Sequence, residues 1–111
     1  METRFSFDKL DDSLIISNKE DKERVKNNFM IDNFVISLTG SGKIVGLEIR
    51  EVSSFLKEIG MDISLLENID RVSLIVTPKR DSIFIGFILE TPNFGSKLIP
   101  ITHVPIEAIK N

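Results

Sequence analysis

Ser82-Ile83-Phe84-Ile85-Gly86-Phe87-Ile88-Leu89 contains the longest apolar run of the chain, at residues 83–89. Only the first residue of this stretch is polar. A strand that is apolar at every position is typically buried on both faces. Turn-forming residues flank this stretch at 78–81 and at 91–96. We therefore expect a β-strand over residues 82–89 that is central in its sheet, or whose second face is covered by another subunit.

The residues on either side of this stretch predict two further strands, at 73–76 and at 98–102. Pro100 and Pro105 favour an edge position for the later strand, because proline has no N–H to donate to a neighbouring strand. A final helical turn is expected at 106–109.

The first half of the chain predicts strands at 4–7, 14–16, 34–38 and 43–49. The first two are separated by an aspartate-rich turn at 8–12, and the last two by a glycine-containing turn at 39–42. Along residues 43–49, period-two alternation places Val45, Leu47 and Ile49 on one face of the strand. It places Ile44, Gly46 and Glu48 on the other face.

Two short helices are expected after these strands. Ser53 or Ser54 can cap the first, and Gly60 can end it. Asp62 can cap the second helix. We expect Ile63 and Leu66 of this helix to point inward. The polar segment 18–28 fits either a helix or a solvated edge strand, and its residue propensities do not decide between them.

Together these elements predict an α+β fold that is predominantly antiparallel β, a meander of about six to eight strands with one or two short helices. We expect a single domain over residues 1–111, with a β-meander and helix in 1–60 and a short helix and further strands in 61–111. Residues 12–16 resemble residues 81–85, so an internal duplication stays open.

Composition excludes several classes of protein. The net charge of −3 argues against a general nucleic-acid binder, which would be basic. The absence of cysteine excludes disulfides, thiol nucleophiles and cysteine-bound metal centres. The N-terminal residues lack the features of a signal peptide, and the apolar run at 83–89 is too short to cross a membrane. We expect a cytoplasmic protein without nucleic-acid or membrane partners.

Two segments of the first half resemble a known pattern. Phe7-Asp8, three further residues and Asp12-Ser13-Leu14-Ile15-Ile16 are similar to aromatic-D-x-x-x-D-x-L-x-I. Gly42-Lys43-Ile44-Val45-Gly46-Leu47-Glu48-Ile49, with Ser53 four residues later, is similar to G-K-I-V-G-x-E-I-x-x-x-S. In this order, over about residues 4–58, they resemble an uncharacterised family of small bacterial and archaeal proteins, a domain of unknown function. Phe7 and Ile15 stand where tyrosine is usual in that family.

This resemblance implies a β-meander closed by a short helix, and it favours the strand interpretation for residues 23–29. It implies no enzyme activity. Some relatives are encoded beside small toxin-like proteins, so the resemblance also implies an antitoxin-like partner role, by association only.

Several candidate sites have an ordinary structural explanation. Residues 39–43 lack the spacing of a phosphate-binding loop. A hairpin turn explains the glycines of this segment. Asp8, Asp11 and Asp12 can supply oxygen ligands to a hard cation, but they lack the calcium-loop spacing, and we expect them to form a turn. Glu48 is an outward residue if its face is solvated, and it needs a partner if that face is covered. His103, the only histidine, is expected to be structural or exposed.

Two classes of function follow. The first is a non-catalytic interaction module that self-associates or binds a protein partner. It would use the apolar stretch at 82–89, and we expect a homodimer and no catalytic residue, metal or cofactor. The candidate interface residues are Ile83, Phe84, Ile85, Phe87, Ile88 and Leu89. The second class is a small-ligand binder or enzyme using Glu48 and the Asp8/Asp12 turn. A deep pocket at Glu48 would favour the second class, and a flat apolar surface the first.

Overall fold

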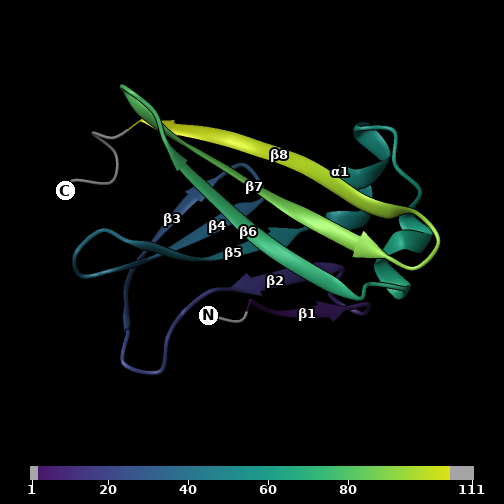
Figure 1. Ribbon diagram of the computed structural model, residues 1–111, viewed down its shortest axis with the longest axis horizontal. Coiled ribbons are helices and arrows are strands. Elements are labelled where there is room, and N and C mark those ends of the chain that lie inside the picture. Colours follow the sequence, from purple (N-terminus) through teal and green to yellow (C-terminus); the bar gives the residue numbers. More distant parts are fainter. Residues whose placement is uncertain (1–2, 106–111) are drawn as a thin grey trace.

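The computed structural model of the protein describes residues 3–105, and its strands form two antiparallel sheets (Figure 1). The larger sheet has the strand order β1-β2-β5-β4-β3, and the smaller has the order β6-β7-β8. The strands of the larger sheet are β1 (Arg4–Asp8), β2 (Ser13–Ser17), β3 (Val25–Ile31), β4 (Phe34–Thr39) and β5 (Ile44–Arg50). Those of the smaller sheet are β6 (Arg71–Pro78), β7 (Ser82–Thr91) and β8 (Gly95–Pro105).

The expected fold class is confirmed. Residues 3–105 contain eight antiparallel strands, one α-helix, α1 (Val52–Glu58), and one 3₁₀ turn, η1 (Ile63–Glu67). The order of the larger sheet shows that β2 pairs with β5 and not with β3. The connector at 18–24 therefore carries the chain past β5 and β4 to the far edge. The helical turn expected at 106–109 lies outside the described residues.

The core lies between the two sheets. Figure 1 shows the smaller sheet lying across the larger one, with α1 at one end of the layers. Inward side chains from both sheets and from the two short helices meet there. The largest fully buried members are Leu14, Ile16, Ile36, Leu47, Ile49, Leu56, Ile85, Phe87, Leu89 and Ile99. Because each sheet contributes only its inner face, both outer faces remain outside this core.

The segment 18–28, which the sequence left open, is a connector followed by an edge strand. Residues 25–31 form β3, which pairs only with β4 among the described strands. Five of its seven residues are exposed, including the first four, which explains why the sequence showed no apolar period.

A β-bulge corrects the face assignment along β5. The register shifts where Leu38 pairs with Ile44 and Ser37 pairs with Gly46, so β5 holds one extra residue at this point. An extra residue reverses the alternation on one side of the bulge. Ile44 therefore joins the core with Leu47 and Ile49, whereas Val45 is buried outside the core cluster.

The helix caps also differ in part from expectation. Neither Ser53 nor Ser54 caps α1, because Glu51 occupies the N-cap position in a left-handed conformation with no side-chain cap bond. Asp62 does cap η1, accepting a hydrogen bond from the Ser64 N–H. Leu66 is buried as expected, together with Leu65, whereas Ile63 is 40% exposed and does not join the core.

Candidate functional site

The six apolar residues proposed as an interface divide between the two faces of β7. Ile85, Phe87 and Leu89 are buried in the core, and Ile83 packs against it. Phe84 and Ile88 point to the opposite side. Strand alternation causes this division, since neighbouring side chains point to opposite faces. Of the six proposed interface residues, only Phe84 and Ile88 are therefore available to a partner on the outer face.

Phe84 and Ile88 belong to a wider apolar surface, which we call the outer patch. The strand register places Ile75 beside Gly86, Leu98 beside Ile88, and His103 beside Phe84. The His103 ring lies 5.2 Å from the Phe84 ring, centroid to centroid. The outer patch comprises Ile75, Phe84, Gly86, Ile88, Leu98, Pro100 and His103. Leu98 is its most accessible large apolar side chain, with 60% of its surface exposed.

Gly86 keeps the middle of the outer patch flat. A Cβ atom at this position would lie 2.8 Å from the Ile99 carbonyl oxygen and 3.1 Å from the Phe84 ring. The Phe84 ring therefore lies against the glycine, where a larger residue would displace it. The register shift between Ile85 and Gly86 marks the same point of β7 as irregular.

A groove crosses the outer face of the larger sheet and runs from strand to strand, along residues that pair with one another. Its floor is a row of small side chains: Ser17 pairs with Gly46, Gly46 with Ser37, and Ser37 with Asn28. These residues come from β2, β5, β4 and β3, so the row spans four strands. We call this feature the transverse groove, and its volume is about 310 Å³.

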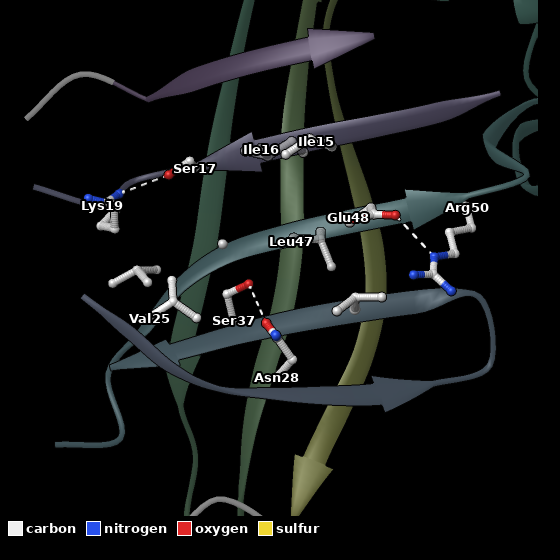
Figure 2. A pocket seen from close by; sticks show the side chains of 13 residues that line it. Ile15, Ile16, Ser17, Lys19, Val25, Asn28, Ser37, Leu47, Glu48 and Arg50 are labelled. Atoms are coloured by element: carbon white, nitrogen blue, oxygen red, sulfur yellow. Dashed lines mark hydrogen bonds and ion pairs between the residues drawn. The ribbon is translucent and has the colours of Figure 1, made fainter. Parts of the chain in front are cut away.

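Figure 2 shows the labelled residues of the transverse groove from outside the larger sheet. Lys19 and Val25 lie on one side of the floor, and Ile15, Glu48 and Arg50 lie on the other (Figure 2). The Ser37 hydroxyl donates to Asn28 Oδ1 at 3.0 Å, and the Lys19 N–H donates to Ser17 Oγ at 3.2 Å. The groove is therefore lined by both polar and aliphatic groups.

Ion pairs and hydrogen bonds fix the connector that forms one wall. Lys43 Nζ lies 2.8 Å from Glu23 Oε2, and Arg4 donates to the Lys19 carbonyl at 2.7 Å. The hydrogen bond from Lys43 lowers the pKa of Glu23, and the same bond raises the pKa of Lys43. Lys19 Nζ donates to the carbonyl oxygens of Glu20 and Glu23. These contacts hold Val25 and Lys19 beside the floor.

Glu48 is an outward residue with a charged partner. It lies on the outer face of β5, with Ile15 and Val35 as its neighbours on β2 and β4. Its Oε2 accepts from Arg50 Nε at 3.0 Å. Glu48 is therefore the outward residue of the first alternative, partly exposed and paired with Arg50.

The aspartates of the first turn bind backbone and serine groups. Asp8 Oδ1 accepts from the N–H groups of Leu10 and Asp11, at 3.0 and 3.2 Å. Asp12 reaches across to the start of α1, where its Oδ2 accepts from Ser53 Oγ at 2.6 Å. Its Oδ1 accepts from the Ser53 N–H at 3.2 Å. Asp12 thereby caps α1 from a distant part of the sequence.

The structure does not bring Glu48 and the Asp8/Asp12 turn together in one site. Glu48 lines the transverse groove, whereas Asp12 lines a separate hollow of about 240 Å³ with Phe7, Ser53 and Leu66. Among residues 3–105, no group of three or more histidine, aspartate or glutamate side chains is arranged to hold a metal ion.

Sequence reasoning named Glu48 but missed the residues that form the floor of the transverse groove. Ser17, Ser37 and Asn28 are unremarkable in the sequence and far apart in it. Only the pairing of β2 with β5, of β5 with β4 and of β4 with β3 places them in one row. The sequence predicted part of the outer patch, because Phe84 and Ile88 belong to the apolar stretch at 82–89.

A scan of protein-family models, a search of curated proteins and a search of solved structures each found no match to this chain. In the part of the chain that the structure describes, no helix has the length and apolar character needed to span a membrane.

Proposed function

We propose that this protein is a cytoplasmic, non-catalytic interaction module that self-associates through its outer patch. The observation that carries this proposal is the outer face of β6–β8, which lies outside the core formed by residues 3–105. Ile75, Phe84 and Ile88 lie there outside the core cluster, and Leu98 is mostly exposed. Ile75, Phe84 and Ile88 are half-buried and border the exposed Leu98. Contiguous accessible apolar surface is typical of interaction sites.

The shape of the outer patch favours a second copy of the chain as its partner. The register places its apolar residues across all three strands of one face, without a charged residue between them. The charged residues Arg71 and Glu90 pair with each other at one end of this face. A two-fold axis covers such a patch with the same patch of the partner.

The size of this face predicts a weak, reversible dimer. Strand β7 has ten residues, and three strands of that length cover roughly 33 Å by 14 Å, or about 450 Å² per copy. The total of about 900 Å² falls below the range of stable specific interfaces. We therefore expect dissociation in the micromolar range.

The resemblance of residues 4–58 to the uncharacterised prokaryotic family is also retained as a proposal. The contact between Asp12 and Ser53 supports it, since these residues belong to the two different motif segments and bind each other at 2.6 Å. Membership would add no activity to the interaction module.

Light scattering with a matched pair of variants tests the proposed function. Leu98→Lys places a charge within the outer patch, and Met30→Lys places one on the larger sheet at a side chain of nearly equal exposure, 58% against 60%. We expect the wild type and Met30→Lys to gain mass with concentration between about 10 μM and 1 mM, and Leu98→Lys to stay monomeric. Equal behaviour of the two variants would exclude the outer patch as the interface.

A further inference from the structure

We infer that the transverse groove binds a small organic carboxylate with an aliphatic body. This site is independent of the outer patch, because it lies on the outer face of the other sheet. The argument rests on the hydrogen-bonding groups of its floor, the charges at its sides, and its volume.

The floor of the transverse groove has donors to spare. Ser17 Oγ already accepts from the Lys19 N–H, so its own hydroxyl proton can be donated. Asn28 Oδ1 already accepts from Ser37 Oγ, and the Asn28 amide nitrogen has no partner among residues 3–105. A ligand that pairs with these donors supplies acceptor atoms, such as the oxygens of a carboxylate.

The charges beside the floor favour an anion. Lys19 and Arg50 line the groove together with the single carboxylate of Glu48, which leaves an excess of one positive charge in a protein of net charge −3. Glu48 binds Arg50 Nε, and the other two guanidinium nitrogens have no hydrogen bond within the described residues. A guanidinium presents such N–H groups in a geometry that suits a carboxylate.

The walls and the volume favour a short aliphatic body. Ile15 and Val25 are 45% and 43% exposed on opposite sides of the floor, and Val35 lies next to Glu48. A groove of about 310 Å³ is at the lower limit for small-molecule sites.

Octanoate, with a carboxylate and a short alkyl chain, is the probe that fits this description. We expect it to bind with a dissociation constant on the order of 1 mM, as is usual for a ligand of this size in an open groove. In a ¹H–¹⁵N NMR titration, saturable shifts should centre on Ser17, Gly46 and Ser37. Octylamine, with the same chain and the opposite charge, should bind more weakly.

A matched pair of arginine variants tests the charge contribution. Arg50→Gln removes the cation beside the groove, and we expect octanoate affinity to fall about two- to fivefold, the range of an exposed ion pair. Arg71→Gln is the control, because Arg71 is also an exposed strand arginine whose Nε faces a glutamate, Glu90. It lies on the other sheet and should leave the affinity unchanged.

Three results would overturn the inference: no saturable shift at the groove, equal binding of octanoate and octylamine, or equal effects of the two arginine variants. Octanoate shifts confined to the outer patch would also overturn it, by showing that the probe follows apolar surface alone. Self-association of the protein would be untouched by any of these results, so the two proposals fail separately.

Discussion

At the scale of single residues, Asp12 links the β1–β2 hairpin to α1. Its backbone adopts a positive φ of 53° at the end of the turn between β1 and β2. Its carbonyl oxygen accepts from the Val52 N–H, and its carboxylate accepts from both polar groups of Ser53. The N–H groups at the start of a helix have no partner within the helix. Asp12 satisfies two of them and joins the hairpin to α1.

Ser53→Ala is expected to lower the free energy of unfolding by about 1–2 kcal/mol, because it removes a hydrogen bond to a charged carboxylate. Ser54→Ala is the matched control, since Ser54 is the next residue of α1 and its side chain is exposed. We expect the control to change the stability by less than about 0.5 kcal/mol. Urea unfolding of the two variants measures the difference, and equal midpoints would show that the Asp12–Ser53 bond contributes nothing.

At the scale of elements, β7 is constrained by Gly86. Gly86 lies against the backbone of the adjacent strand β8, where the Ile99 carbonyl oxygen leaves no space for a Cβ atom. The Phe84 ring fills the space on the outer side. The glycine is thus required by packing and not by a positive φ.

Gly86→Ala is expected to destabilise the protein by about 1–3 kcal/mol, the usual range for an added atom in a filled space. Gly40→Ala is the control, because its Cβ would meet only the flexible Lys26 side chain at 3.4 Å. Thermal unfolding of both variants provides the comparison. A Gly86→Ala protein as stable as the control would mean that β8 shifts easily away from β7.

Much of the element structure could be predicted from the sequence. Alternation and turn residues located the strands other than β3, and Asp62 was recognised as the cap of η1. The β5 bulge could not be predicted, because it depends on how β4 pairs with β5. The cap of α1 was missed for a similar reason, since its donor and acceptor lie 41 residues apart. The floor of the transverse groove likewise depends on strand order, which local patterns do not determine.

At the scale of the whole molecule, the two candidate surfaces lie on opposite outer faces of a two-layer fold. The core uses the inner face of each sheet, so the smaller sheet carries the outer patch and the larger one carries the transverse groove. This arrangement leaves the groove open when two copies pair through the outer patch. A dimer would therefore hold two such grooves, both facing away from the interface.

Concentration-dependent ¹H–¹⁵N NMR tests self-association through the outer patch most directly. Between about 10 μM and 1 mM, we expect the amide resonances of Ile75, Phe84, Ile88 and Leu98 to shift as the dimer forms, while those of β1–β5 remain in place. Resonances that do not change over this range would contradict the account. So would shifts confined to the edge strands β1 and β3, because they would indicate that the copies pair edge to edge through the larger sheet.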